Sequence, residues 1–221
     1  MTADLFECMR TLRAVRRFEP RPIPKDVLHA LLTAATWAPS GSNSQPWGFV
    51  AVRDSGLKRS VRDLYLTHFA SADRAYTAFA EAAGTLDDRQ RRLMAAAREL
   101  AEHLDDAAVL LFPCIDKQRY PIIFDADGNA RDPLTLYASI LPAVQNLLLA
   151  ARAHGIGGCL TTILRFCDRE VRALLALPAH VATTVMVPLG YPRDPFGPLT
   201  RRPASAVTYR DRWGTPLFDA D

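Results

Sequence analysis

The chain has 221 residues, of which 49% are hydrophobic and 23% charged, so it is long and apolar enough to bury a core of its own, which excludes a disordered chain. The formal net charge of +3 is too small to indicate a nucleic-acid partner. The four cysteines form no CxxC motif and no histidine pair has the spacing of zinc ligands, so we expect free thiols and no metal site.

The N-terminal quarter is predicted to contain two helices followed by a strand. Apolar spacing predicts a short helix over residues 4–13 and a second helix that begins near Pro24. The second helix is expected to stop before Pro39, because the residue ahead of a proline disfavours the helical region. Residues 47–52 are continuously apolar, which predicts a strand buried on both faces.

The middle of the chain is predicted to be mainly helical. Residues 54–105 have helical periodicity, with expected breaks near Ser71 and near Gly84. Within this stretch an Ala-rich amphipathic helix is expected over residues 89–104, with these side chains facing inward: Leu93, Ala97, Leu100 and Leu104. A second buried strand is expected over residues 107–115.

The C-terminal half is predicted to contain a long central helix and a third strand. The helix covers residues 134–154 and ends at Gly155, and a shorter helix covers residues 168–176. Residues 181–189 are β-branched and apolar, which predicts one strand. From residue 190 to 221 the chain is rich in proline and arginine and has no core pattern, so we expect an extended tail that lies across another surface.

These elements predict one α+β domain over residues 1–221, a three-layer α/β/α sandwich with helices on both faces of a small mixed sheet. The first residues, MTADLFECMRTLRAV, contain no apolar core of a secretory signal. The most apolar run, residues 134–164, is interrupted by polar and charged side chains. We therefore expect no membrane partner and a cytoplasmic location.

Two polar clusters near the N-terminus each allow two interpretations. The segment Arg13-Ala-Val-Arg16-Arg17 is either a solvated basic turn or an anion site, since guanidinium groups donate in pairs to a phosphate. The loop WAPSGSNSQPW contains Ser40, Asn43 and Gln45 between two tryptophans. It is either a connection that satisfies its own backbone or a cradle for a flat polar ring, because amides carry both a donor and an acceptor.

A third cluster lies toward the C-terminus. It consists of Arg201 and Arg202 in the tail, together with two pairs that precede them by about forty residues, Gly157-Gly158 and Thr161-Thr162. Alone, the glycines indicate a helix stop and the arginines a solvated tail. Other catalytic classes find no support, since the sequence has no GxSxG elbow, no P-loop and no GxGxxG motif, and none of the five histidines has an identifiable partner.

Together, four segments resemble the FMN-dependent nitroreductase family. They are Arg13-Ala-Val-Arg16-Arg17-Phe18, Ala38-Pro39-Ser40-x-x-Asn43-x-Gln45-Pro46-Trp47, the helix from Ala143 to Gly157, and the Arg-Arg-Pro tail. Residues 60–130 carry no family motif and are expected to form a variable helical segment.

The resemblance implies a homodimer with two flavin sites at the interface, each lined by both chains. The residues that it places at FMN are Arg13, Ala14, Arg16, Ser40, Asn43, Gln45, Thr161, Thr162, Arg201 and Arg202. Arg16 is expected near the N1/C2 carbonyl edge of the ring, and the two threonines near N5 and O4. The tryptophans on either side of the loop are expected to fix it. From the variable segment, the residues expected to contact the substrate are Tyr65, Phe69 and Phe124.

Two positions depart from the family pattern. Where the family often has Arg-Arg-Ser, this chain has Leu12-Arg13-Ala14, which removes one phosphate donor and one hydroxyl. Where some members have a glutamate near N5, this chain has Thr162. The flavin potential and the choice of substrate are expected to differ accordingly.

The implied function is a ping-pong oxidoreductase that uses FMN to pass electrons from NAD(P)H to a flat acceptor such as a nitroaromatic or a quinone. The cofactor carries the chemistry, so no catalytic side chain is expected. Two alternatives stay open. One is a specialised flavoenzyme of the same family, such as a reductive dehalogenase, a flavin-cleaving enzyme or a dehydrogenase of a natural product. The other is a flavin-binding protein without turnover.

Overall fold

The computed structural model describes residues 4–120 and 133–218. Its helices are α1 (Leu5–Thr11), α2 (Lys25–Thr36), α3 (Ser55–Ala82), α4 (Asp88–Glu102), α5 (Pro133–Ala153) and α6 (Asp168–Leu174). Its strands are β1 (Trp47–Val52), β2 (Val109–Asp116), β3 (Gly157–Gly158), β4 (Val181–Thr183) and β5 (Val187–Gly190). Helices and strands therefore fall close to the predicted ranges, with the exceptions given below.

Strand β2 is the centre of the sheet. It pairs with β1 along one edge and with both β5 and β4 along the other, and β3 adds to the far side of β5. Every pairing among the described strands is antiparallel, so the predicted α+β class holds while the expectation of a mixed sheet is wrong. Because β1 has a neighbour on one side only, the middle of β1 is half-buried, whereas it was predicted to be buried on both faces.

The predicted single strand over residues 181–189 is divided into β4 and β5 by a bulge. Cys114 pairs with Thr183 and Leu111 pairs with Val187, so one strand advances four residues while β2 advances three. The extra residue lies opposite Pro113, which has no N–H to offer a neighbouring strand. Thr184 adapts to this gap, since its N–H and its hydroxyl both donate to the Pro113 carbonyl, at 3.3 and 2.7 Å.

Alternating side chains of β2 build two separate cores, one on each face of the sheet. On one face, Leu111 and Ile115 pack with α2 and α5. On the other face, Leu110 and Phe112 pack with α3, α4 and α6. This alternation follows from the two-residue repeat of a strand and produces the predicted three layers.

Helix α5 is the most apolar helix in the described part of the chain. Leu134–Ala153 has the length and the mean hydropathy, 1.5, of a membrane-crossing helix. Its inner side chains lie in the core against α2 and the sheet, where Ile140, Ala143 and Ala151 are 0% exposed. Packing in the core accounts for the apolar side chains on this inner face.

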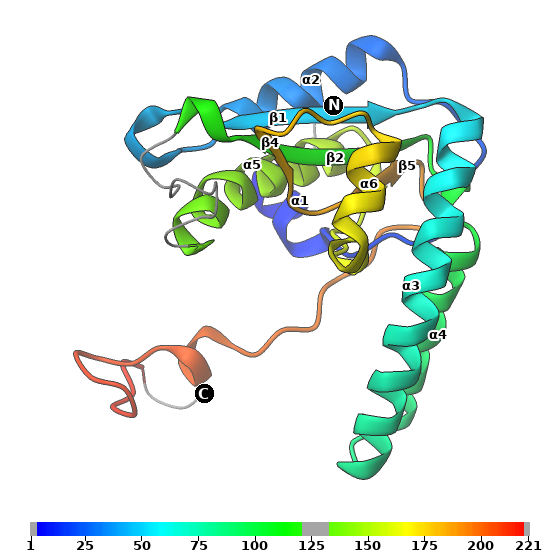
Figure 1. Cartoon of the computed structure of the whole chain (residues 1–221). Coiled ribbons are helices and arrows are strands. Elements are labelled where there is room, and N and C mark those ends of the chain that lie inside the picture. Colours follow the sequence, from blue (N-terminus) through cyan, green and yellow to red (C-terminus); the bar gives the residue numbers. More distant parts are fainter. Residues whose placement is uncertain (1–3, 121–132, 219–221) are drawn as a thin grey trace.

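Helices α3 and α4 form an antiparallel pair whose far ends project beyond the sheet (Figure 1). The predicted break at Ser71 does not occur, because a serine flanked by alanines costs a helix little. The break at Gly84 does occur, and Gly84 has a φ of 65°. Leu93 was predicted to face inward but is 47% exposed, since the projecting end of α4 has no sheet to cover.

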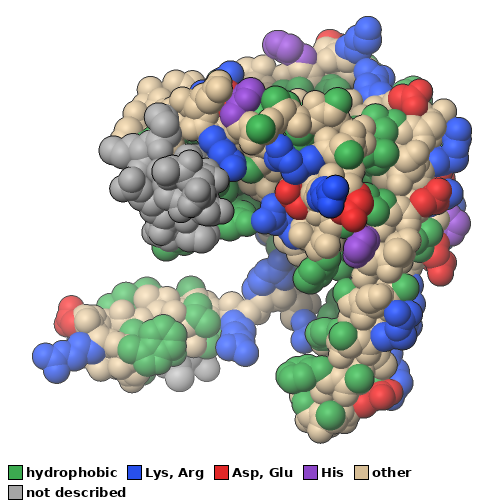
Figure 2. All heavy atoms as spheres, viewed as in Figure 1, with side chains coloured by type: hydrophobic (Ala, Val, Ile, Leu, Met, Phe, Trp, Pro, Cys, Tyr) green, Lys and Arg blue, Asp and Glu red, His purple; other side chains and the backbone are tan. Residues whose placement is uncertain are grey.

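The tail after residue 199 leaves the body as an extended segment and ends in a small hooked turn (Figure 1). In this turn the rings of Tyr209 and Trp213 lie 4.5 Å apart between centroids. Trp213 is nevertheless 89% exposed, and apolar side chains are conspicuous on the surface of the hook (Figure 2).

The N-terminal segment lies directly on the sheet because glycines leave room for it. A Cβ atom on Gly157 would lie 2.7 Å from the Val15 Cβ, and one on Gly190 would lie 2.8 Å from the Phe18 ring. The Val15 N–H donates to the Gly158 carbonyl at 3.0 Å and the Glu19 N–H donates to the Tyr191 carbonyl at 2.8 Å. The segment that carries Arg13, Arg16 and Arg17 is thus fixed by close backbone approach.

We predict that Gly157→Ala destabilises the protein by about 1–3 kcal/mol, the usual cost of overpacking a filled interior. The new methyl group would displace Val15 and weaken the bond to Gly158. Gly48→Ala, in β1, is the matched control, because its methyl group would meet nothing within 4 Å. Urea unfolding of the two variants checks this, and equal stabilities would contradict the close approach.

Candidate functional site

The three arginines of the first polar cluster lie on the outside of the N-terminal segment. Val15 and Phe18 of the same segment are buried, at 9% and 1% exposed, and fix its inner side. On the outside, the Arg193 N–H donates to the Arg17 carbonyl at 3.1 Å. The segment is therefore held between β3 and the start of the tail, with its guanidinium groups directed away from the core.

A cavity of about 470 Å³ lies against this segment. Its lining residues come from the segment, from α4 and from the start of the tail: Arg13, Ala14, Val15, Arg16, Arg17, Ala95, Ala96, Glu99, Pro192, Asp194, Pro195 and Phe196. A volume of this size is within the usual range of small-molecule sites. The structure thus brings Arg13, Ala14 and Arg16 together on one cavity.

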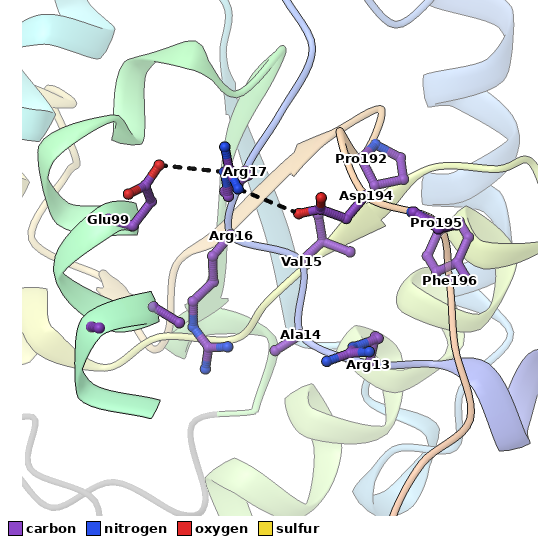
Figure 3. A pocket seen from close by; sticks show the side chains of 12 residues that line it. Arg13, Ala14, Val15, Arg16, Arg17, Glu99, Pro192, Asp194, Pro195 and Phe196 are labelled. Atoms are coloured by element: carbon purple, nitrogen blue, oxygen red, sulfur yellow. Dashed lines mark ion pairs between the residues drawn. The ribbon is translucent and has the colours of Figure 1, made fainter. Parts of the chain in front are cut away.

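The three arginines differ in how their charge is balanced. Arg17 Nε lies 3.4 Å from Glu99 Oε1, and its Nη1 lies 3.9 Å from Asp194 Oδ2 (Figure 3). Arg13 and Arg16, which lie on either side of Ala14 in Figure 3, have no ion pair with any carboxylate of the described residues. Arg13 and Arg16 are therefore the two cations of this cavity that are free to bind an anion.

Arg152 of α5 contacts one wall of the cavity. Its Nε donates to Thr11 Oγ1 at 2.9 Å, and its guanidinium carbon lies 4.1 Å from the centroid of the Phe196 ring. Phe196 is one of the cavity walls. Arg152 thus ties together the end of α1, helix α5 and the start of the tail.

Tyr65 and Thr161 form a hydrogen bond, and Thr161 lines a small cavity that is separate from the arginine cavity. The two hydroxyl oxygens are 2.9 Å apart. Burial raises the pKa of Tyr65 to about 12, while the bond to Thr161 and the charge of Arg16 act in the opposite direction. Burial likewise raises the pKa of Cys159 to about 11, against the charge of Arg16. Both groups are therefore neutral at neutral pH.

The Ser40–Gln45 loop satisfies much of its own backbone. Ser40 Oγ accepts from the Gln45 N–H at 3.0 Å, and the Gly41 N–H donates to Ser139 Oγ at 3.2 Å. Ser42, Asn43 and Gln45 all have a positive φ, near 50°. Three left-handed residues without glycine store strain, which structures usually tolerate where a loop has a function. No hydrogen bond of the Asn43 side-chain amide is found within residues 4–120 and 133–218.

The loop lies on a different cavity from the arginines. This second cavity, about 440 Å³, lies between the loop and the first turns of α5 and is lined by Pro39, Ser40, Gly41, Leu134, Thr135, Ala138 and Ser139. It shares no lining residue with the arginine cavity. Within one chain, the predicted ring cradle and the predicted phosphate site are therefore apart.

The two tryptophans beside the loop do not act alike. Trp47 is buried, at 6% exposed, and packs in the core with α2 and α5. Trp37 is 77% exposed, so the prediction that both rings fix the loop is wrong for Trp37. The second contact comes instead from Tyr120, whose hydroxyl would lie 2.9 Å from a Cβ atom on Gly41.

The remaining predicted residues are dispersed. Thr162 is exposed, and Arg201 and Arg202 lie exposed on the tail, where Arg201 donates only to the neighbouring Thr200 carbonyl within the described ranges. Phe69 is 9% exposed and stacks on the Tyr65 ring. Both rings therefore lie in the core of this chain, whereas they were predicted to contact the substrate. Phe124 lies outside the described residues.

Sequence reasoning missed the α4 wall of the arginine cavity. Ala95, Ala96 and Glu99 line it, whereas only the opposite side of this helix was considered. The run of alanines at residues 95–97 was the available signal, since small side chains allow another segment to approach a helix closely. Within the parts that the structure describes, no group of three or more His, Cys, Asp or Glu residues is placed to hold a metal ion.

Comparison with known proteins identifies the family. The model of the nitroreductase family matches residues 9–191. An NADH dehydrogenase of Thermus thermophilus is 31% identical over 204 residues, covering 88% of this chain and 90% of that protein.

Two solved structures share the fold. The NADPH:FMN oxidoreductase of Vibrio harveyi, complexed with NAD⁺, is 26% identical with a TM-score of 0.67 and covers 95% of this chain and 77% of its own. Oxidised iodotyrosine deiodinase, bound to FMN and 3-iodo-L-tyrosine, is 28% identical with a TM-score of 0.66 and covers 95% and 99%. The family match over most of the chain confirms the resemblance found in its motifs, and the protein belongs to the nitroreductase family.

Proposed function

We propose that this protein is an FMN-dependent oxidoreductase that passes electrons from NAD(P)H to a flat aromatic acceptor, working as a homodimer whose two sites are each lined by both chains. The enzyme class and the use of FMN are supported by the family and by the relatives named for NADH, NADPH and FMN. The acceptor and the dimer are our inference from the site.

One observation carries the proposal: Arg13 and Arg16 lie on the same cavity without a carboxylate partner among the described residues, beside an arginine that has two. A cavity that presents two unbalanced cations favours an anionic ligand. The phosphate of FMN fits Arg13, and the polar edge of the ring fits Arg16. The residues present therefore fit the cofactor.

The protein contributes binding, orientation and exclusion of water. Bound FMN would supply the two-electron chemistry, accepting a hydride from NAD(P)H and giving it up to the acceptor. Arg16 is positioned to stabilise negative charge on the polar edge of the ring, as a preorganised cation does. Ala95 and Ala96 leave space for a flat ligand. A quinone acceptor would take up the hydride and one proton from solvent to become a quinol, so no acidic side chain is required.

The dimer follows from the separation of the two cavities. The two cavities of one chain share no lining residue, which fits a site in which Arg13 and Arg16 of one chain are completed by the Ser40–Gln45 loop of a second copy. A shallow apolar groove between α1, α2 and α5 is lined by residues that include Leu5, Trp37 and Leu149. Leu5 and Trp37 are 55% and 77% exposed, which favours burial against another surface.

Reductive dehalogenation is the second candidate, favoured by the 28% identity to iodotyrosine deiodinase over 95% of this chain. The two reactions share the reductant and differ in the acceptor. Breaking a carbon–iodine bond would consume one hydride and release iodide. A nitroaromatic would instead take up one hydride and one proton at its nitro group and release water to give the nitroso compound, so its carbon–nitrogen bond is kept.

Purified protein is expected to be yellow, to lose its visible flavin band when NADH or NADPH is added without oxygen, and to regain it with an acceptor. Stopped-flow absorbance with a quinone, a nitroaromatic and 3-iodotyrosine separates the candidates. Recovery with 3-iodotyrosine alone, with release of iodide, would favour dehalogenation. A flavin that binds but is never reduced would leave only a binding protein, and a preparation that takes up no added FMN would end the proposal.

Arg13→Ala is expected to raise the Kd for FMN by about tenfold to a hundredfold, because a charge-assisted hydrogen bond to phosphate is lost. The Kd for riboflavin, which lacks the phosphate, should stay nearly unchanged. Arg17→Ala is the matched control, since Glu99 and Asp194 already balance its charge. Flavin fluorescence titration measures both constants, and equal losses for the two flavins would contradict a phosphate role.

Mixed dimers test whether each site uses two chains. Asn43→Ala and Arg13→Ala should each weaken FMN binding while leaving a folded dimer. Co-refolding the two variants then places both lesions in one site and restores the wild-type residues in the other. About half the sites of the mixed dimer should recover wild-type affinity. No recovery would mean that Arg13 and Asn43 act within the same chain.

A further inference from the structure

Arg193 lies between two residues of the cavity wall, but its own side chain is directed elsewhere. Pro192 and Asp194, its neighbours in the chain, both line the arginine cavity, whereas Arg193 does not (Figure 3). The Arg193 Nε donates to the Phe18 carbonyl at 2.7 Å, and its Nη2 lies 3.5 Å from Asp106 Oδ2. The side chain therefore contacts the N-terminal segment from outside the cavity.

The Phe18 carbonyl depends on Arg193 for a donor. Phe18 is 1% exposed, so its carbonyl is buried from water. In the antiparallel bridge between Phe18 and Pro192 the flanking residues make the backbone bonds, among them the Arg193 N–H to the Arg17 carbonyl at 3.1 Å. No backbone N–H within residues 4–120 and 133–218 donates to the Phe18 carbonyl. Because a buried carbonyl without a donor is destabilising, the Arg193 Nε holds this part of the segment in place.

Arg16 lies between two points at which the N-terminal segment is fixed. On one side, the Val15 N–H donates to β3 at 3.0 Å. On the other side, the Arg17 and Phe18 carbonyls accept from the backbone and the side chain of Arg193, respectively. The backbone of a residue sets the direction of its side chain, so these two attachments determine how Arg16 enters the cavity that it lines.

Arg13 is held by other contacts. The Leu199 N–H donates to the Arg10 carbonyl at 3.1 Å, which ties the tail to the end of the segment where Arg13 lies. A change in the Arg193 side chain is therefore expected to displace Arg16 and to leave Arg13 in place.

We propose that Arg193 is a positioning residue for Arg16: by donating to the Phe18 carbonyl, it sets the position of the Arg16 guanidinium in the arginine cavity. This inference rests on the proposed function, in which Arg16 stabilises negative charge on the flavin ring. Arg193 acts through the hydrogen bond of its Nε, and its positive charge is not required.

Three substitutions separate the hydrogen bond from the charge. Arg193→Gln keeps an N–H donor at the place of Nε and loses the charge. Arg193→Lys keeps the charge but has a carbon at that place, and Arg193→Met has neither donor nor charge. Arg193→Gln is expected to retain the wild-type Kd for FMN, whereas the other two should raise it by about threefold to tenfold. Fluorescence titration of the apo protein measures this, and tighter binding by Arg193→Lys than by Arg193→Gln would overturn the proposal.

The reduction potential of bound FMN is a readout that a loss of stability alone would not change. A displaced Arg16 weakens the binding of reduced FMN, which is more negative, more than that of oxidised FMN. Arg193→Met is therefore expected to lower the potential, by about 30 mV for each tenfold difference between the two affinities. Arg193→Gln should keep the wild-type potential. An unchanged potential in Arg193→Met would contradict a role through Arg16.

A double-mutant cycle identifies the residue through which Arg193 acts. In an Arg16→Met background, Arg193→Met should have no further effect on the Kd for FMN. In an Arg13→Ala background, its full effect should remain. An equal effect in both backgrounds would show that Arg193 does not act through Arg16 and would overturn the proposal.

Arg53→Met is the matched control. Arg53 Nη2 donates at 3.1 Å to the carbonyl of Ile23, which is also fully buried, and Arg53 does not line the arginine cavity. Arg53→Met should lose stability in urea, as Arg193→Met does, and keep the wild-type Kd and potential. If Arg193→Met does not fold, Arg193→Lys against Arg193→Gln still decides, because equal affinities of these two would exclude a role for the Nε donor.

The outcomes separate this inference from the proposed function. A wild-type protein that takes up no FMN would end both. A wild-type protein that binds and reduces FMN, with Arg193→Met and Arg193→Lys indistinguishable from it, would leave the proposed function intact and remove only the role of Arg193.

Discussion

The close contact of the N-terminal segment with the glycines of the sheet is the constraint on which the site depends. Val15 packs where Gly157 has no side chain and Phe18 packs where Gly190 has none. The segment can therefore approach near enough for the Val15 N–H to reach the Gly158 carbonyl. Any side chain at these glycines would move the segment outward and carry Arg13 and Arg16 away from α4 and from the start of the tail.

Charge then distinguishes residues that the sequence alone presents as equivalent. Three arginines lie within five residues, and one of them is balanced by Glu99 and Asp194, which come from α4 and from the start of the tail. Arg13 and Arg16 have no such ion pair among the described residues, so their charges remain available to a ligand. A similar division is seen at the loop, where Ser40 and Ser139 satisfy the backbone while the Asn43 amide is exposed and available. Local pairing, and not residue type, decides which polar groups can bind.

Patterns with a strong period were predictable from the sequence, and contacts between distant segments were not. Strand β1 was predicted to the residue, and α2 and α5 nearly so, because their apolar spacing and their flanking prolines and glycines are local signals. The division of β4 from β5 depends on Pro113 in a neighbouring strand, which no local pattern reveals. The inward position of Tyr65 and the outward position of Trp37 likewise depend on which surfaces α3 and α2 happen to cover. The motif residues were found, but their division between two cavities required the fold.

The bulge opposite Pro113 also limits how this chain can change in length. Side chains along a strand alternate between its two faces, so removing or adding one residue between Thr183 and Val187 would reverse the face that Met186 presents. Met186 and Thr161 form two backbone hydrogen bonds, in which the N–H of each residue donates to the carbonyl of the other. Substitutions in this segment can be absorbed by repacking, whereas a single-residue insertion or deletion would break the link to Thr161. Among proteins that share this sheet, we therefore expect the length of the segment between Thr183 and Val187 to vary less than its amino-acid types.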